Sequence, residues 1–355
     1  MANQVLYGYN NLQDLASERI VGNLIPVVTD AIQQAVAEHN RQLDAIFDLF
    51  VERTVLYKER YKQVGAARLQ PVDDDGRARP IKPSGYYDVA FPIQAGGTAW
   101  GANYVTRAKM TVDDVARQLD MMLIADIRWV RDHILGALFQ TTAWTFTDPL
   151  YGALSVQPLA NGDGVLYNII AGNDAGADDT HQLGQAGAIS ATNPFPTIYT
   201  ELNEHPENGG KTIAFIPTGL KANTEALATF QPVADANIRV GADSNQLVGS
   251  LGVAVPGTVI GYETSGVWIV EWPFLPANYI VAVTTDGPRP VAMREDPEEE
   301  LRGFKQVAER ADHPFWESQW LRRAGFGIRN RVGAVVMEVS DASYDIPSGY
   351  ETPMP

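Results

Sequence analysis

The feature that most constrains this chain is a long aperiodic segment placed directly before its clearest helix. Residues 66–104 carry prolines at 71, 80, 83 and 92 and glycines at 76, 85, 96, 97 and 101. Only short β-prone pieces lie between them, so the pattern predicts extended chain broken by turns. A connection of this length with no helix of its own is typical of a functional or binding arm. We expect this arm to pack mainly on a neighbouring copy of the chain and to bury little against its own.

The charge of the arm differs in sign from that of the whole protein. The chain carries 43 acidic and 27 basic residues, a formal net charge of −16. Between residues 66 and 109 the basic residues are Arg68, Arg77, Arg79, Lys82, Arg107 and Lys109, against Asp73, Asp74, Asp75 and Asp88. This contrast predicts that the arm lies on the acidic surface of a neighbour, where each rim charge contributes little because it is screened. The expected contact residues on the arm are Arg77, Arg79, Lys82, Tyr86 and Tyr87.

A long helix is predicted directly after the arm. Thr111 and Asp114 have the spacing of a capping box. An apolar stripe then runs to Phe139, through Val112, Val115, Leu119, Leu123, Ile127, Val130, Ile134 and Leu138. At about 1.5 Å per residue this helix would be roughly 40 Å long. Asp126 and His133 do not belong to this stripe, so we interpret them as solvated or interface residues.

A second amphipathic helix is predicted near the N-terminus, over residues 30–61. Its stripe consists of Val28, Ile32, Val36, Leu43, Ile46, Phe47 and Phe50. Such a stripe requires a partner, since burying one Phe or Leu contributes about 1.5–3 kcal/mol. We expect a retained arm that clamps a neighbour, with Phe47 and Phe50 in the contact. His39, at the edge of the stripe, is interpreted as a packing or rim histidine.

The remainder of the chain alternates between helices and strands. Helices are predicted near 197–204 and 219–230, and strands at 212–217, 258–262, 267–272 and 279–284, which indicates an α/β subdomain with a mixed sheet. Residues 290–295 and 315–323 are expected to form a hairpin around a charged stretch. The almost uniformly apolar residues 333–339 predict a strand central in a sheet.

Composition excludes several classes of function. The absence of cysteine excludes disulfides, zinc–thiolate sites and thiol nucleophiles. No apolar run is long enough to span a membrane, and the first residues lack the pattern of a secretory signal, so synthesis in a cytoplasm is expected. A strongly negative chain lacks the basic footprint that direct nucleic-acid binding needs, although an acidic wall can enclose nucleic acid without gripping it.

Motifs for catalysis are weak or missing. Gly209-Gly210-Lys211-Thr212 ends like a phosphate-binding loop, but His205 occupies the position of its first glycine, so a turn entering a strand is favoured. Asp178, Asp179 and His181 offer carboxylate and imidazole ligands for a cation, yet a solvated run in a Gly-rich loop is the favoured interpretation. The five histidines are scattered in sequence. We therefore expect no enzyme activity, no catalytic or metal-binding residue and no cofactor.

The order of segments resembles that of the Hong Kong 97-type capsid proteins of tailed phages, an α+β fold shared with encapsulin nanocompartments. Residues 266–283 and 321–336 carry the resemblance best: a valine-rich strand followed by a P-x-x-Y-I turn, and an arginine-flanked strand before the last apolar strand. The resemblance implies an N-terminal arm at 1–64 with the amphipathic helix and an extended β-hairpin loop at 65–109. It further implies a peripheral domain with a spine helix at 110–194 and 289–330, an axial domain at 195–288 and 331–345, and a tail at 346–355.

By this resemblance the chain would be a major capsid protein that assembles into pentamers and hexamers of an icosahedral head. It would enclose DNA without specific binding, in a virion assembled in the host bacterial cytoplasm, with no membrane association. Scaffolding, portal and decoration proteins are candidate partners. The lysine–asparagine crosslink of the type member is not carried over, because Lys82 and Lys109 have no matching asparagine and glutamate. The alternatives are an encapsulin-type shell and, from another class, a metal-dependent hydrolase using Asp178, Asp179 and His181.

Overall fold

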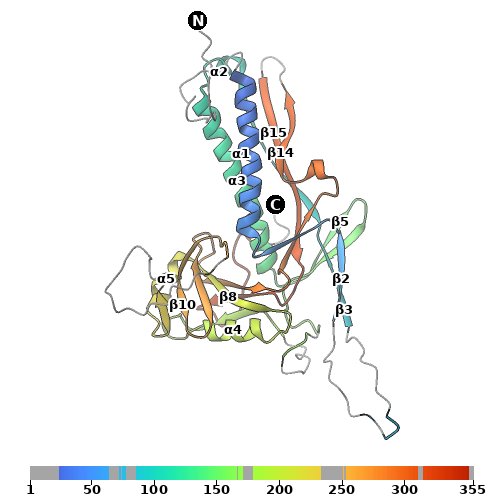
Figure 1. The fold of residues 1–355 in the computed structure, drawn as a ribbon, viewed down its shortest axis with the longest axis vertical. Helices are drawn as coiled ribbons and strands as arrows, with labels where there is room; N and C mark the ends of the chain where they lie inside the picture. Colours follow the sequence, from blue (N-terminus) through green and yellow to red (C-terminus); the bar gives the residue numbers. More distant parts are fainter. Residues whose placement is uncertain are drawn as a thin grey trace. The chain divides into compact units, whose positions relative to one another are not determined.

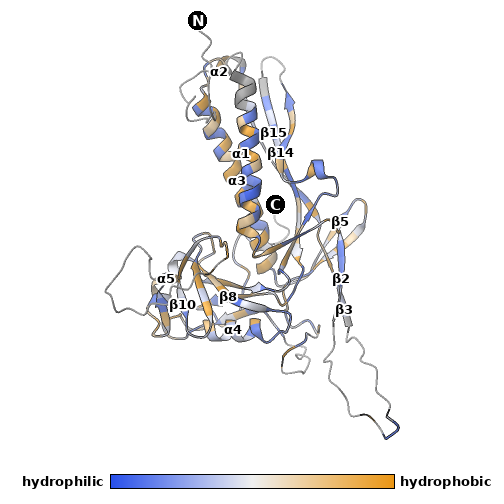
Figure 2. Ribbon diagram, in the orientation of Figure 1, coloured by the Kyte–Doolittle hydropathy of each residue, from blue (hydrophilic) through white to orange (hydrophobic). Residues whose placement is uncertain are grey.

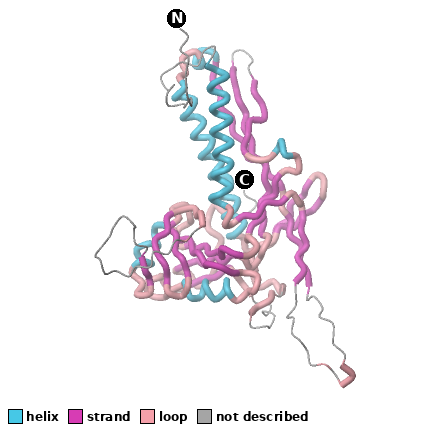
Figure 3. The backbone as a smooth tube through the Cα atoms, in the orientation of Figure 1, coloured by secondary structure: helices cyan, strands magenta, loops and turns pink. Residues whose placement is uncertain are grey.

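The computed structural model describes residues 24–63, 72, 74–76, 85–165, 167–170, 179–232, 251, 253–310 and 315–351. These residues divide between two compact units. The first draws on Met1–Ala45, Ile93–Asp132 and Glu295–Ala324, and the second on Ile46–Pro92, His133–Arg294 and Gly325–Pro355. Helices and strands alternate in both (Figures 1 and 3). Among the described residues, no helix is long and apolar enough to cross a membrane.

The first unit packs two long helices against strands. It holds most of α1 (Leu24–Phe47) and α3 (Val112–Phe139), together with β4 (Ile93–Asn103), α2 (Tyr104–Arg107), η2 (Glu299–Leu301) and β14 (Phe304–Arg310). β14 runs antiparallel to the first part of β15 (Phe315–Ile328), which also pairs with β4. The core joins Ile32 and Val36 of α1, Val112 and Val115 of α3, and Trp320 of β15. Long-range packing of apolar helix faces on strands therefore holds this unit together.

The predicted capping box at the start of α3 is confirmed. The Thr111 backbone N–H donates to Asp114 Oδ2 at 2.9 Å, and the Asp114 N–H donates to Thr111 Oγ1 at 3.3 Å. These two bonds satisfy donors that the first turn of a helix leaves free. The apolar stripe is buried at Val112, Leu119 and Ile134. The sequence thus located the start of this helix and part of its core face, although Ile127 of the predicted stripe is 38% exposed.

A seven-stranded mixed sheet forms the centre of the second unit, in the order β7-β16-β12-β8-β11-β10-β9. Its strands are β7 (Gln182–Gln185), β8 (Gly209–Ile216), β9 (Phe230–Pro232), β10 (Thr258–Glu263), β11 (Val267–Glu271), β12 (Tyr279–Asp286) and β16 (Ala334–Val339). β8 is parallel to β11 and antiparallel to β12, so the predicted mixed sheet is confirmed. β16 lies between β7 and β12, as the uniformly apolar closing strand predicted.

Two helices, α4 (Phe195–Asn203) and α5 (Thr218–Glu225), pack on one face of this sheet through Phe195, Ile198, Leu202 and Leu220. The remaining strands of the unit are β1 (Val51–Thr54), β2 (Lys58–Gln63), β3 (Gly85–Ala90), β5 (Trp144–Asp148), β6 (Gly152–Val156) and β13 (Val291–Glu295). β1 pairs parallel with β13, β2 pairs antiparallel with β3, and β5 pairs antiparallel with β6. Figure 2 shows β2 as a mostly hydrophilic strand.

Two predictions of secondary structure and one of burial are corrected. The N-terminal helix ends at Phe47 instead of continuing to residue 61, because the β-branched residues Val51 and Thr54 enter a strand beside β13. The charged stretch 296–312 contains a strand, β14, which pairs with the first part of β15. The arm buries more than expected: Val89 and Phe91 are fully buried, and β4 joins the sheet of the first unit.

The Gly209–Thr212 motif opens β8, so the interpretation as a turn entering a strand is confirmed. Gly210 has a φ of +75°, and a Cβ there would overlap Thr285 Oγ1. Lys211 Nζ donates to the Leu251 carbonyl at 3.0 Å, a structural use of the lysine.

We expect Gly210→Ala to lower the free energy of unfolding by at least about 1–2 kcal/mol, because alanine is strained in the left-handed region and also meets Thr285. Chemical denaturation measures this, with Gly219→Ala as the control, since a Cβ at Gly219 meets no atom within 4 Å. Equal stability of the two variants would contradict the prediction.

Candidate functional site

The expected contact residues of the arm have different environments. Arg77, Arg79 and Lys82 lie outside the described residues. Tyr86 is 63% exposed, with the Arg60 guanidinium 4.3 Å from its ring centroid. Arg60 in turn donates to both carboxylate oxygens of Asp88, at 2.7 and 3.0 Å. Tyr86 therefore remains available as a contact residue at the base of the arm.

Tyr87 fits the expected role only in part. Its ring stacks on Tyr61 with centroids 5.3 Å apart, and the Arg331 guanidinium lies 5.7 Å from its centroid. Burial raises the pKa of Tyr87 above its ordinary range, although Arg331 opposes this shift. Tyr87 therefore packs partly within its own chain, and its contact with a neighbour stays a prediction.

Phe47 and Phe50 are likewise buried in their own subunit. Phe50 is fully buried, with ring centroids 5.0 Å from Phe215 and 5.7 Å from Trp272, and Phe47 is 5% exposed. Little of either ring is left for a neighbour. The expectation that these two residues clamp a neighbouring copy is therefore wrong, because the chain turns at residue 50 and places both rings in its own core.

We expect Phe50→Ala to lower the free energy of unfolding by about 3–5 kcal/mol, through loss of buried area and the cavity left behind. The control is Leu150→Ala, at a side chain that is 85% exposed, with an expected change within about 0.5 kcal/mol. Chemical denaturation of the unassembled chain compares the two. A stable Phe50→Ala chain that assembles poorly would instead support the expectation that Phe50 contacts a neighbouring copy.

A buried ionic network lies within the first unit, where solvated residues were expected. Arg322 donates to both carboxylate oxygens of Asp126, at 2.6 and 2.8 Å, and to Asn40 Oδ1 at 2.7 Å. His39 Nε2 lies 2.8 Å from Asp126 Oδ2. The Asp126 side chain is only 1% exposed, so its interpretation as a solvated or interface residue is corrected.

His133, in the second unit, is also buried, with its ring 5.4 Å from that of Phe326.

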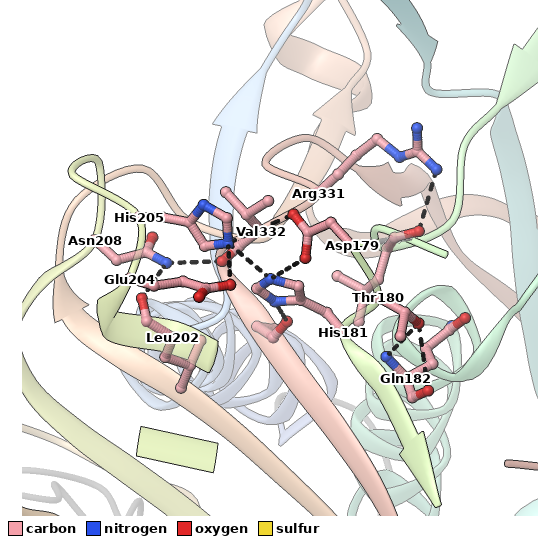
Figure 4. Close-up of polar contacts among 12 residues, drawn as sticks. Asp179, Thr180, His181, Gln182, Leu202, Glu204, His205, Asn208, Arg331 and Val332 are labelled. Atoms are coloured by element: carbon pink, nitrogen blue, oxygen red, sulfur yellow. Dashed lines mark hydrogen bonds and ion pairs between the residues drawn. The ribbon is translucent and has the colours of Figure 1, made fainter. Parts of the chain in front are cut away.

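A second polar cluster in the second unit gathers residues that are distant in sequence (Figure 4). Asp179 and His181 precede β7, and Glu204 and His205 follow α4. The two imidazole Nε2 atoms are 3.0 Å apart. Asp179 Oδ1 lies 3.7 Å from His181 Nε2, Asp179 Oδ2 lies 3.7 Å from His205 Nε2, and Glu204 Oε1 lies 3.7 Å from His205 Nε2. We call this group, with the nearby Glu201, the His–Asp cluster.

The backbone holds the His–Asp cluster in place. The His181 N–H donates to the Ala160 carbonyl at 2.9 Å, and the His181 carbonyl accepts from Val336 N–H at 2.8 Å. The Asp179 carbonyl accepts from Gly162 N–H at 2.9 Å. Residues 179–181 are thus fixed between the 160–162 loop and β16 by main-chain bonds, so their side chains have defined positions.

Burial dominates the electrostatics of the cluster. It lowers the pKa of His181 to about 3, with His205 adding to the effect, and it lowers the pKa of His205 as well. It raises the pKa of Asp179 to about 6, against the attraction of Arg331, and that of Glu201 to about 7. Both imidazoles are therefore neutral near pH 7, the form in which imidazole is a metal ligand.

The sequence interpretation of this region is corrected in part. Asp178 lies outside the described residues, but the side chains of Asp179 and His181 are 2% and 0% exposed and belong to no solvated run. His205 comes from another segment, and sequence spacing alone gives no sign of the pairing. The local signal that was available is the D-x-H spacing of Asp179 and His181.

Comparison with solved structures shows which fold this is. The chain matches a structure of Mycobacterium phage Patience with a TM-score of 0.69 and 19% identity, over 100% of this chain and 99% of that one. It matches the capsid of cyanophage P-SCSP1u with a TM-score of 0.51 and 10% identity, over 84% and 88% of the two chains. For the mature capsid of bacteriophage PhiM1 the TM-score is 0.50 at 9% identity, over 83% and 87%.

Sequence comparison adds no relative: no family model matches, and neither does any curated protein. At these identities the structural similarity establishes a shared architecture. It extends over the whole chain and includes α1, α3 and the seven-stranded sheet. The chain has the α+β fold of a phage capsid protein.

Proposed function

We propose that this chain is the major capsid protein of a tailed phage and that it assembles, in pentamers and hexamers, into an icosahedral head around the genome. The observation that carries the proposal is the end-to-end structural match, at a TM-score of 0.69, together with two matches to structures described as phage capsids. The role is structural, with no catalytic step. The virion is the proposed location, after assembly in the host cytoplasm, with scaffolding, portal and decoration proteins as candidate partners.

The proposed domains follow the order of a Hong Kong 97-like subunit. Residues 1–64 form the N-terminal arm, 65–109 the extended loop, 110–194 and 289–330 the peripheral domain, 195–288 and 331–345 the axial domain, and 346–355 the tail. The seven-stranded sheet supports the axial assignment, because β8 to β12 and β16 lie in those ranges. β7 pairs with β16, so we extend the axial domain to include residues 182–185.

Exposed apolar side chains support repeated contacts between copies. Met121, Ile124 and Ile127 are 64%, 48% and 38% exposed, and their spacing places them on one face of α3. Leu150 and Phe274 are 85% and 59% exposed. Single exposed apolar residues are ordinary, but a stripe along a helix is typical of an interaction surface. We propose that the α3 stripe (Met121, Ile124 and Ile127) contacts a second copy of this chain.

The basic residues of the arm are proposed to add electrostatic attraction to these contacts. We expect the simultaneous reversal of Arg77, Arg79 and Lys82 to Glu to hinder assembly far more than any single reversal, because a screened rim charge contributes roughly 0–1 kcal/mol. Light scattering during assembly at low and high salt measures the effect. Normal shells from the triple variant would remove this part of the proposal.

The central test is assembly of the full chain. Expressed alone in bacteria and viewed by negative-stain electron microscopy, it is expected to form capsomers or closed shells. Mass spectrometry of shells without nucleic acid would detect co-purified enzymes, which an encapsulin-type compartment would contain and a phage head would not. A chain that stays monomeric at high concentration, and that hydrolyses substrates when a metal is added, would overturn the proposal in favour of the hydrolase.

A further inference from the structure

The two histidines of the His–Asp cluster have an unusual arrangement of hydrogen bonds. His181 Nδ1 lies 2.8 Å from the Ala334 carbonyl oxygen, and His205 Nδ1 lies 2.8 Å from the Asn168 carbonyl oxygen. A carbonyl can only accept, so both Nδ1 atoms carry the proton. In a neutral ring the other nitrogen then has a lone pair and no proton. The two Nε2 atoms, 3.0 Å apart, therefore face each other as two acceptors.

Two facing lone pairs repel each other, and a positive charge between or beside them removes this repulsion. A proton is one candidate, but it would place a charged imidazolium where both rings are almost completely buried. A metal ion is the other candidate. Ligands at about 2.0–2.1 Å around a tetrahedral zinc ion lie roughly 3.3 Å from each other, close to the observed separation. A ligand histidine commonly donates its other ring N–H to a carbonyl, as both of these do.

Asp179 gives an independent indication. Its side chain is 2% exposed, and its Oδ2 has no hydrogen-bond partner within the described structure. Leaving a buried carboxylate oxygen unsatisfied costs about 1–3 kcal/mol or more, so such atoms call for an explanation. Both oxygens of Asp179 point toward the histidines, each 3.7 Å from one Nε2 atom. A cation bound to the imidazoles would satisfy this carboxylate as well.

Further carboxylates border the same position. Ligand atoms of Asp179, His181 and His205 all lie within 4.8 Å of one another, and so do those of Asp179, Glu201 and Glu204. Two imidazoles with one or two carboxylates form a donor set suited to zinc and similar divalent transition metals, whereas calcium and magnesium prefer oxygen ligands alone. The fully buried His181 indicates a closed structural site instead of an open catalytic one.

We propose that Asp179, His181 and His205, with Glu204 as the fourth ligand, bind one divalent transition-metal ion of the zinc class as a structural crosslink. The ion would join the segment before β7 to the segment that follows α4. Because a ligand that binds only the folded chain stabilises it by mass action, the metal makes stability depend on metal concentration. The site is independent of whether the chain forms shells.

The experiment uses the full chain, unassembled, after exhaustive dialysis against a chelator. Isothermal titration with Zn²⁺ is expected to show one ion per chain, and the melting temperature is expected to rise with added Zn²⁺ but not with Ca²⁺ or Mg²⁺. Co²⁺ gives a second readout, since its visible absorption reports nitrogen and oxygen ligands directly. Asp179→Asn and His205→Gln are each expected to weaken Zn²⁺ affinity by at least about 10–100-fold, the loss that is usual when only an outer-shell partner of a ligand is removed. His133→Gln, at a buried histidine outside the cluster, is the control with unchanged affinity.

The wild-type titration keeps the test decisive if a variant fails to fold. A folded wild-type chain that binds no Zn²⁺, or shows no rise in melting temperature, would overturn the proposal. Equal Zn²⁺ affinity in wild type and in the folded Asp179→Asn and His205→Gln variants would also overturn it, because the ion would then be adventitious. Shell formation without bound metal would refute the metal site and leave the proposed capsid function intact.

Discussion

Replacing Arg322 with Met is expected to lower the free energy of unfolding by about 3–5 kcal/mol, the usual cost of leaving one charge of a buried pair without its partner. Arg322 and Asp126 have side chains that are 3% and 1% exposed, and two hydrogen bonds join them. Without the guanidinium, the Asp126 carboxylate would keep His39 as its neighbour at 2.8 Å but lose its permanent cation. The desolvated charge that remains is the source of the cost.

A double replacement separates the charge effect from loss of packing. In Arg322→Met with Asp126→Leu no buried charge is left alone, so we expect the double variant to recover more than half of the loss. The matched control is Arg323→Met on the same strand. Its partner Asp296 lies at 2.8 Å, but Arg323 is 37% exposed, so a loss below about 1 kcal/mol is expected. Equal losses for Arg322→Met and Arg323→Met in denaturant unfolding would contradict the argument.

The same pair predicts a response to acid. Burial alone would raise the pKa of Asp126, but hydrogen bonds from His39 and Arg322 outweigh it and hold that pKa below its ordinary value. A carboxyl whose pKa is lower in the folded state stabilises the fold above its unfolded pKa, about 3.9, and loses this contribution as the pH falls further. The double variant should therefore lose less stability than wild type between about pH 4 and pH 2.

Local signals predicted the parts of the fold that local interactions determine. The capping box at Thr111 and Asp114 depends on residues three positions apart, and the uniformly apolar β16 needs no partner to be recognised. The end of α1 was missed because Val51–Thr54 pairs with Val291–Arg294, far along the chain. β14 was missed because four of its seven residues are polar or charged (Lys305, Gln306, Glu309 and Arg310), so it has no continuous apolar run that would mark a strand.

The buried polar residues show where sequence patterns mislead. Asp126 lies four residues after Met122 and four before Val130, both buried, so it occupies a core-facing position of α3. A carboxylate there indicates a buried partner, but Arg322 comes from a strand 196 positions away. The His181–His205 pair likewise depends on how β7 and α4 meet the rest of the sheet. Neither partner can be identified without the three-dimensional fold.

Replacing both Met121 and Ile124 with Asp is expected to abolish shells while leaving the subunit folded. These side chains are 64% and 48% exposed, so the fold loses little, within about 0.5 kcal/mol at each site. In an assembled shell the same face would be covered by a second copy, and an unpaired carboxylate buried there costs several kcal/mol. That cost recurs at every copy of the contact, so even a moderate penalty prevents closure.

Met121→Leu with Ile124→Leu keeps the α3 stripe apolar and serves as the matched control, with normal assembly expected. Analytical ultracentrifugation and negative-stain microscopy measure the assembled fraction, and thermal unfolding of the unassembled chain measures the fold. Shells of normal yield from the double Asp variant would place the α3 stripe outside the contact. A double Asp variant that unfolds would show instead that the stripe stabilises the subunit itself. The structure favours the first role, because most of the Met121 side chain is exposed and can contact a neighbour.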